Sequence, residues 1–218
     1  MKPTVSVLLP SRGNPDKCSQ AIRSLLLMAD HPTWIEIILR LDRDDPTRED
    51  YPAYIEPILG QRYGGYQDLN RMYEECATFS KGDVLLIYND DLKCVTKGWD
   101  SLYLKHAHEH PLRPMCCRIT GDHYHWAFPA VSRQLYRKVG NRICPSETFV
   151  VDRIWHEVAN AKGWTADDCR VEVTLHHDRI EPENGPEDRK HHMRYVNQDW
   201  QFLQAKWKAE GEAIAKTL

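Results

Sequence analysis

Blocks of apolar and polar residues alternate along the first 91 positions and predict strands and helices in turn. Short apolar runs at 4–9, 34–41 and 84–88 each end at turn-forming polar residues, as buried strands do. Between them, apolar residues recur at helical spacing over 16–28 and 66–80. Strands that alternate with helices favour right-handed βαβ units. We therefore expect an α/β fold with a mostly parallel central sheet.

The second half of the chain has a less regular pattern. Helices are predicted at 98–110, 132–139 and 147–163, and an alternating strand at 170–175. A polar loop at 178–189 precedes a C-terminal amphipathic helix, predicted within 193–218. No internal repeat or linker is visible, so we expect a single domain over 1–218.

Each predicted strand of the first half ends in polar residues. These are Ser11 and Arg12, then Asp42 and Asp45, then Asn89, Asp90 and Asp91. In open α/β sheets, ligands bind outside the carboxyl ends of the strands. We therefore expect the three groups to converge on one crevice.

The third group carries the clearest chemical signal. Asp90 and Asp91 are adjacent carboxylates, and two like charges at one strand end are unfavourable unless a cation offsets them. Mg²⁺ and Mn²⁺ prefer one or two carboxylates together with phosphate oxygens. The segment therefore predicts a site for a metal and a diphosphate. A solvated aspartate turn is the alternative interpretation.

Composition narrows the class of protein. Of the 218 residues, 41% are hydrophobic and 28% are charged, which excludes disordered, collagen-like and coiled-coil chains. The net charge of −3 predicts no global attraction to nucleic acid or to anionic membranes. Wholly apolar runs are too short for a transmembrane segment, and the start lacks the apolar stretch of a signal peptide. We expect a soluble, cytoplasmic protein.

The cysteines predict the same compartment. The chain has seven, an odd number, and none of them has C-x-x-C spacing. Adjacent cysteines such as Cys116 and Cys117 rarely bridge each other. We expect reduced cytosolic thiols rather than a disulfide framework or a zinc site.

With these segments in this order, the chain resembles the GT-A-fold glycosyltransferases of the family 2-like type. The resemblance covers about residues 4–177. It rests on Val5-Ser-Val-Leu-Leu-Pro10-Ser-Arg-Gly, Arg40-Leu-Asp42-Arg-Asp-Asp, the run from Gly65 to Asn70, and Gly82-Asp-Val-Leu-Leu-Ile-Tyr-Asn-Asp-Asp91. It implies a GT-A-like, Rossmann-type three-layer sandwich. It also implies a nucleotide-binding half at 1–95 and an acceptor half at 96–192, with 193–218 as a helical tail.

The resemblance implies a site for a nucleotide-sugar donor, most simply a UDP-sugar. Pro10, Ser11 and Arg12 would lie along the nucleoside, and Asp42 would accept the N3–H of uracil. The other implied contacts are Asn70 near the donor, Asn89 or Asp90 at the ribose, and Asp91 on Mn²⁺ or Mg²⁺. The metal would neutralise the leaving diphosphate. The family motif is Asp-x-Asp, and here Asn89 stands in its first position.

Two adjacent histidines follow the predicted strand at 170–175. Members of the family place a metal-ligating histidine at such a late strand end, so the resemblance implies His176 or His177. Alternation puts Val173, Leu175 and His177 on one face, which favours His177 if that face points inward. The alternative is that both are ordinary surface histidines.

The resemblance also implies a general base. The family has a Glu-Asp pair opening a helix, and Asp152 matches its aspartate, although Val151 stands before it. In an inverting reaction, this base would take the proton of the acceptor hydroxyl as it attacks the anomeric carbon. Glu147 is the reserve candidate. Alternatively, Asp152 is simply an acidic residue favoured by a helix N-terminus.

Aromatic residues from 123 to 128 fall in the implied acceptor half. Tyr124 and Trp126 would stack on the sugar or on the acceptor, and packing in the core is the alternative for Trp126. For the acceptor itself, a hydroxymethylated DNA base and a cell-surface glycan both stay open. The first would suit a soluble bacteriophage-type enzyme in the cytosol of the infected host, and the second a bacterial cytosolic enzyme.

Three functions are consistent with the sequence. The first is a metal-dependent glycosyltransferase. The second is a sugar nucleotidyltransferase, which is disfavoured because Pro10-Ser-Arg-Gly13 holds one glycine where a glycine-rich start is expected. The third is a non-catalytic nucleotide-binding module, which Asn89 and Val151 keep open.

Overall fold

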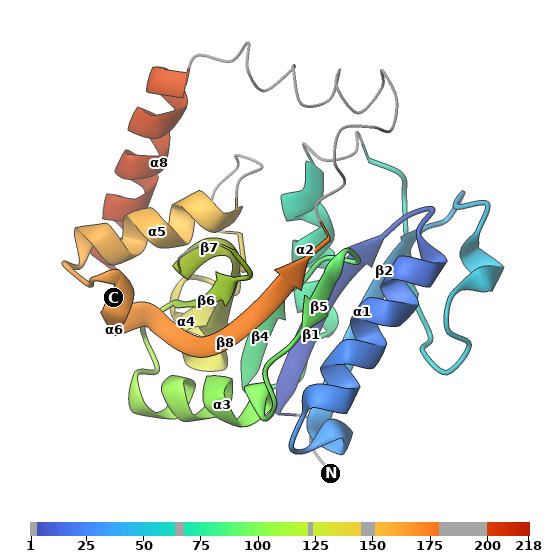
Figure 1. Cartoon of the computed structure of the whole chain (residues 1–218). Helices are drawn as coiled ribbons and strands as arrows, with labels where there is room; N and C mark the ends of the chain where they lie inside the picture. The colour runs from blue at the N-terminus through green and yellow to red at the C-terminus, as the bar shows by residue number, and fades with distance from the viewer. Residues whose placement is uncertain (1–3, 64–67, 122–123, 145–150, 179–199) are drawn as a thin grey trace.

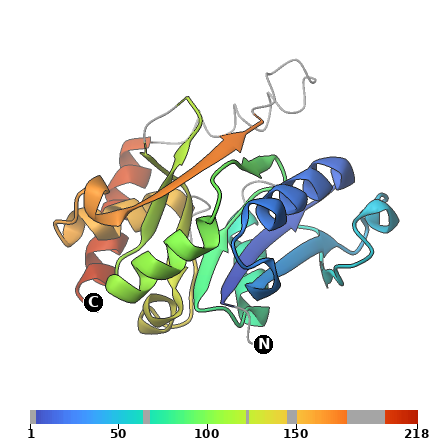
Figure 2. The same cartoon turned by 60° about the horizontal axis from the view of Figure 1, so that its bottom comes forward.

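The computed structural model describes residues 4–63, 68–121, 124–144, 151–178 and 200–218 (Figure 1). These residues form three layers, with helices on both faces of a central sheet (Figures 1 and 2). The α/β fold class expected from the sequence is therefore confirmed. No helix in the described ranges has the length and apolar character needed to cross a membrane.

The sheet has eight strands in the order β3-β2-β1-β4-β7-β6-β8-β5. Their bounds are β1 (Val5–Ser11), β2 (Ile35–Asp42), β3 (Ile58–Gly60), β4 (Val84–Ile87), β5 (Leu92–Cys94), β6 (Met115–Ile119), β7 (Tyr124–Ser132) and β8 (Arg170–His177). The half from β3 to β4 is parallel throughout, as the βαβ pattern predicts. The other half is mixed: β7 is antiparallel to β4 and β6, β8 is parallel to β6, and β5 is antiparallel to β8.

The helices form the outer layers. They are α1 (Pro15–Met28), α2 (Leu69–Phe79), α3 (Trp99–Glu109), α4 (Arg133–Lys138), α5 (Val151–Ala161), the short α6 (Ala166–Cys169) and α8 (Trp200–Ala215). Helices α1 and α3 pack on one face of the sheet, where Leu25 and Trp99 are fully buried. Helices α2, α4 and α5 pack on the other face, where Tyr73 and Trp155 are buried. Helix α8 lies against α5 (Figure 1).

Alternation along the central strands explains how the sheet supports both cores. In β1, Val5, Val7 and Leu9 face α1, and Leu8 faces the opposite core. Because both faces are buried, the strand is apolar at almost every position, which is the pattern of a buried parallel strand. The polar residues predicted to form the site lie where the strands end and the chain leaves the sheet, whereas Ser6 in β1 and Arg40 in β2 are buried polar residues inside strands.

Several predicted segments differ from the structure in their extent, among them two helices of the second half of the chain. The helix expected at 147–163 begins in the described residues at Val151, and residues 145–150 lie outside them. The C-terminal helix expected within 193–218 is α8, which begins at Trp200. The His-rich and aromatic segment at 117–128, to which the sequence assigned no element, contributes to the antiparallel pair β6 and β7.

Candidate functional site

The ends of β1 and β4 are joined by a short hydrogen bond. The Oγ of Ser11 donates to Oδ2 of Asp90 at 2.5 Å, and it also lies 3.0 Å from the hydroxyl of Tyr51. The Tyr51 hydroxyl in turn accepts the backbone N–H of Asn14 at 3.2 Å. The polar residues that end separate strands are thus brought to one edge of the sheet, as the strand order requires.

The turn after β1 is shaped by a carboxylate from the turn after β2. Oδ2 of Asp45 accepts the backbone N–H of Gly13 at 3.0 Å, and its Oδ1 accepts the N–H of Thr47 at 2.9 Å. Burial raises the pKa of Asp45, but these amide hydrogen bonds outweigh it and the net pKa is lowered. Gly13 has a φ of +68°, which a glycine adopts without strain. Asp45 therefore holds the loop that carries Arg12.

Asp90 and Asp91 have different surroundings. Burial raises the pKa of Asp90, the hydrogen bond from Ser11 offsets part of that rise, and the charge of Asp91 adds to it. Asp91 points the other way: its Oδ2 lies 3.0 Å from Nε2 of His177. Its Oδ1 is buried and has no hydrogen-bond partner among the described residues. A buried carboxylate oxygen without a partner is unfavourable unless a ligand supplies one.

The two histidines at the end of β8 point in opposite directions. His177 lies beside Asp91, and the ring of Phe128 packs edge-on against it at 5.6 Å between centroids. The His176 side chain is 46% exposed and lies 3.1 Å from Oδ1 of Asp178, which also pairs with Lys93. Strand alternation produces this division, and the structure places His177 beside Asp91 and His176 beside Asp178.

The residues Asp91 and His177 fit a divalent cation. A carboxylate and an imidazole are ordinary ligands for Mn²⁺, and the unpartnered Oδ1 of Asp91 offers a further oxygen. In the described ranges, His, Cys, Asp and Glu side chains form no group of three or more that could hold a metal. Such an ion would therefore need oxygens from a bound diphosphate and from water to complete its coordination. Mg²⁺ bound together with a diphosphate usually has such a coordination shell.

Asp42 is buried between two arginines. Its Oδ2 accepts NH1 of Arg12 at 2.9 Å, and its Oδ1 accepts NH1 of Arg40. Arg12 also pairs with Asp44 at 2.7 Å. Burial lowers the pKa of Arg12, but its hydrogen bonds to Asp44 and Asp42 outweigh burial and raise it overall. Asp42, the predicted acceptor for a base N–H, thus already has an arginine side chain bound to each of its carboxylate oxygens.

Asn89 and Asn70 lie on the α2 side of the site. The Tyr73 hydroxyl donates to Oδ1 of Asn89. Asn70, in the first turn of α2, is buried and lines an open pocket of about 660 Å³. The pocket is lined by Tyr63, Asn70, Arg71, Glu74, Glu75, Thr78, Arg142 and Cys144. In its wall, Glu74 accepts the backbone N–H groups of Cys144 at 2.7 Å and Ile143 at 3.2 Å, and burial raises its pKa.

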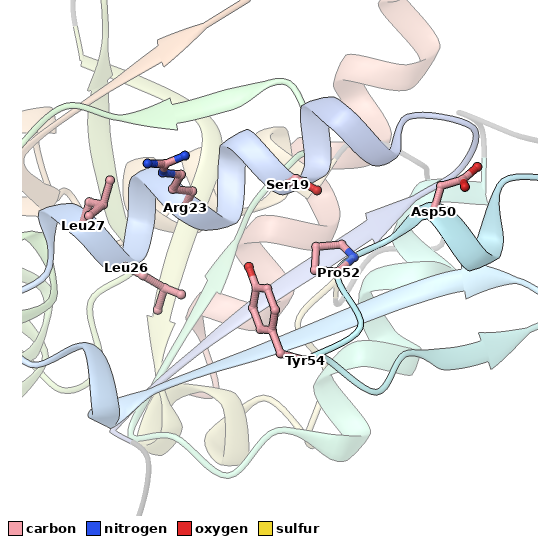
Figure 3. Close-up of a pocket in the computed structure, with 7 residues that line it drawn as sticks. All are labelled: Ser19, Arg23, Leu26, Leu27, Asp50, Pro52 and Tyr54. Carbon is pink, nitrogen blue, oxygen red and sulfur yellow. The ribbon is translucent and has the colours of Figure 1, made fainter.

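A second pocket, of about 390 Å³, lies beside α1, between this helix and residues 50–54 (Figure 3). Its lining residues are Ser19, Arg23, Leu26, Leu27, Asp50, Pro52 and Tyr54. None of them belongs to the predicted site, and Figure 3 shows the aromatic ring of Tyr54 below the helix.

The predicted catalytic and acceptor residues are described only in part. Asp152 falls in the first turn of α5 and Tyr124 begins β7, but their side chains lie outside the described residues, as does Glu147 altogether. Trp126 is half-buried, and its ring lies 5.8 Å from that of His156 on α5. It packs against buried residues on that side of the sheet, which favours a packing role. Pro10 is buried within β1.

Several site residues were not identified from the sequence. Arg40, Asp44, Tyr51 and Tyr73 contact predicted residues directly, and Glu75 and Tyr63 hold Arg40 in turn. A signal for Arg40 existed: it is a charged residue inside an apolar strand, two positions before Asp42 and so on the same face. The tyrosines come from loops and from α2, and their pairing with the strand ends has no sequence signal.

No family model and no curated protein matches the sequence. Among solved structures, the chain is similar to S. aureus TarS 1–349, with a TM-score of 0.56 and 12% identity over 98% of this chain and 70% of that chain. The same protein in complex with UDP gives a TM-score of 0.56 and 12% identity over 97% and 69%. A further structure, titled S. aureus TarS, gives a TM-score of 0.50 and 13% identity over 97% of this chain and 42% of that chain. The chain therefore has a GT-A-like α/β fold, which it shares with these TarS structures.

Proposed function

We propose that this protein is a metal-dependent glycosyltransferase that moves a sugar from a UDP-sugar to a hydroxyl acceptor. The observation that carries the proposal is the meeting of Asp91 with His177 at the edge of the sheet where Ser11 and Asp90 also lie. The similarity to TarS, which has been crystallised in complex with UDP, supports the choice of nucleotide. Ligands of open α/β sheets occupy this edge.

In this proposal the nucleoside lies along Pro10, Ser11 and Arg12. The N3–H of uracil donates to Oδ2 of Asp42, which Arg12 occupies in the protein alone. Because the Arg12 side chain is 33% exposed, it can turn into solvent or toward a base carbonyl without leaving a buried cation unpaired. Asn70, with Asn89 or Asp90, lies at the ribose and the diphosphate.

Asp91 and His177 would hold Mn²⁺ or Mg²⁺, with His176 left outside the site. When bound, the cation would neutralise the charge that develops on the diphosphate leaving group. The protein's own part is to fix the two ligands. β5 pairs with β8 so that Leu92 lies opposite His177, and the residue before Leu92 is Asp91.

The transfer step requires a base near the acceptor. Asp152, in the first turn of α5, takes the proton of the acceptor hydroxyl as its oxygen forms the bond to the anomeric carbon, with Glu147 as the reserve. The bond from the anomeric carbon to the diphosphate oxygen breaks at the same time, and UDP leaves from the opposite face, which inverts the anomeric configuration. The acceptor is a hydroxyl of a cell-surface glycan or of a hydroxymethylated DNA base, bound beside Tyr124 at the start of β7, while Trp126 packs behind it. Residues 1–95 thus form the nucleotide-binding half, to which His177 adds a metal ligand, and 96–192 form the acceptor half, in the cytoplasm of a bacterium or of its phage-infected host.

A thermal-shift screen of nucleoside diphosphates tests the donor site. We expect UDP to raise the Tm with Mn²⁺ present and to do so far less with EDTA. At 100 times its Kd, a ligand stabilises the fold by about 2.7 kcal/mol. For a chain of this size, that corresponds to a rise of roughly 5–10 °C. The donor-site assignment is wrong if no nucleoside diphosphate changes the Tm.

A second assay separates catalysis from binding. Nucleotide sugars are incubated with the protein and Mn²⁺, and released nucleoside diphosphate is measured with and without candidate acceptors. Release of UDP, even by slow hydrolysis, supports the transferase. Tight UDP binding without any release would instead identify a non-catalytic nucleotide-binding module.

A further inference from the structure

We propose that Arg40 is a positioning residue for base recognition: it fixes the orientation of Asp42 so that the site selects uracil over cytosine. This inference rests on the proposed function, because it takes Asp42 as the acceptor of the base. It adds an explanation of base selectivity, which it attributes to a residue that does not contact the nucleotide.

The two arginines on Asp42 differ in burial. The Arg40 side chain is 1% exposed, whereas that of Arg12 is 33% exposed. Each holds a different carboxylate oxygen: Arg40 is bound to Oδ1 and Arg12 to Oδ2. A ligand arriving from solvent can therefore replace Arg12 at Oδ2 while Arg40 stays at Oδ1.

Arg40 is itself held on every side of its guanidinium. Its Nε donates to Oε2 of Glu75 at 2.7 Å, and its NH2 donates to the backbone carbonyl of Gln61. The ring of Tyr63 lies 5.2 Å from its Cζ, and the Tyr63 hydroxyl donates to the other oxygen of Glu75 at 2.6 Å. Two carboxylates, Asp42 and Glu75, thus balance the buried cation and fix its position.

The backbone of β3 is shaped around this guanidinium. Gly60 is paired in register with Asp42, and a Cβ at Gly60 would lie 2.6 Å from Cζ of Arg40. Such a contact is too close, so any larger residue at Gly60 would push the guanidinium aside. The glycine is therefore what allows Arg40 to lie flat beside Asp42.

The chemistry of the two pyrimidines explains why orientation decides selectivity. Uracil presents a ring N3–H donor between two carbonyl oxygens, whereas cytosine presents an acceptor at N3 and its donor on the exocyclic amine. A carboxylate is an acceptor only. Held in one orientation, Asp42 meets a donor in uracil and an acceptor in cytosine. If the carboxylate of Asp42 could rotate, it could instead accept a hydrogen bond from the exocyclic amine of cytosine, and the site would bind both bases.

The test measures the affinity of the holoprotein with Mn²⁺ for UDP and for CDP by calorimetry. In the native sequence, UDP should bind at least about tenfold more tightly than CDP, the usual effect of one unsatisfied buried polar group. Gly60→Ala keeps every charge and displaces Arg40. We expect it to reduce the UDP-to-CDP affinity ratio to within about threefold of unity, with a smaller change in affinity for UDP itself. Leu59→Ala, on the same strand, is the matched control and should keep the ratio.

Arg40→Lys supplies a second variant if Gly60→Ala fails to fold. It keeps the charge but loses the planar fork, so the ratio should fall here too. A folded Gly60→Ala or Arg40→Lys protein that keeps the native ratio overturns the positioning role. So does a native protein that binds both nucleotides equally, although the donor site then stands. A native protein that binds neither nucleotide refutes the proposed function together with this inference.

Discussion

Nε2 of His177 lies 3.0 Å from Oδ2 of Asp91, although 86 positions separate the two residues in the sequence. The contact depends on β5, a strand of three residues that pairs antiparallel with the end of β8. A chain that lost this short pairing would keep both residues but lose the contact between them. The geometry is thus a property of the sheet edge and not of either motif alone.

Replacing His177 with Asn should abolish the Mn²⁺-dependent part of the stabilisation by UDP. The side chain would then be too short to reach the proposed ion, and one of the two proposed protein ligands would be lost. We expect UDP affinity in Mn²⁺ to fall to the value measured in EDTA. The measurement is a UDP titration with and without metal. His176→Asn is the control and should behave like the native protein, since His176 pairs with Asp178. Equal effects of the two substitutions would contradict the assignment.

Asp152→Asn should lower turnover by about 10²–10⁴-fold, because the amide keeps the size of the side chain and removes its basicity. The affinity for UDP should change little, since the base acts on the acceptor. Steady-state assays and nucleotide titrations measure the two quantities separately. Glu49→Gln, at a carboxylate that is 85% exposed, serves as a control and should leave turnover unchanged. If Glu147→Gln is inactive and Asp152→Asn is active, the base is Glu147.

Lowering the pH should destabilise the protein through His106, on α3. Burial lowers the pKa of His106, the contact with the Asp168 carbonyl offsets part of this, and the charges of His110 and Arg113 lower the pKa further. Below the ordinary histidine pKa of about 6.5, the unfolded chain gains a proton that the folded protein resists. The free energy of unfolding therefore falls as the pH drops through 6.5 toward the folded-state pKa, by at most about 1.4 kcal/mol per pH unit.

Urea unfolding at about pH 7.5 and about pH 5.5 measures this effect. His106→Gln should show a smaller loss of stability between the two conditions than the native protein. His108→Gln, on the exposed side of the same helix, should not change the difference. An unchanged pH dependence in His106→Gln would assign the effect to other groups.

Gly82→Ala should destabilise the fold by about 1–3 kcal/mol, as overpacking in a core does. A Cβ there would lie 2.6 Å from the backbone nitrogen of Ser6 and 2.7 Å from its Oγ, and the backbone of β1 cannot move aside cheaply. The free energy of unfolding in urea is the measurement. At the neighbouring exposed position, Lys81→Ala should change it by less than about 0.5 kcal/mol. A Gly82→Ala protein as stable as the native one would show that β1 and β4 can separate without cost.

The parallel half of the sheet could be predicted from the sequence because its strands are buried on both faces. Such strands are continuous apolar runs, and their ends are marked by the first polar residues. That is why Ser11, Asp42 and Asp90 were found as candidate site residues. His177 was preferred over His176 for an equally physical reason, the alternation of side chains along β8.

The remaining parts depend on contacts between residues far apart in the sequence. Arg40 and Glu75 are 35 positions apart, and only the packing of α2 against β2 shows that they form an ion pair. The strand β5 has three residues, too few to show a period. The strand β7 combines histidine, aromatic residues and a proline, a composition that resembles a loop as much as a strand.

The burial of all seven cysteines makes site-specific labelling of the protein practical. All seven are buried, and burial raises the pKa of Cys18, Cys76 and Cys117 to about 12. Thiol reagents attack the thiolate, so the native protein should be almost inert to them. A single cysteine introduced at the surface, for example at Tyr54 with its 70% exposure, would then be the one rapidly labelled position. Fluorescent or spin labels could be attached there without first removing any native cysteine.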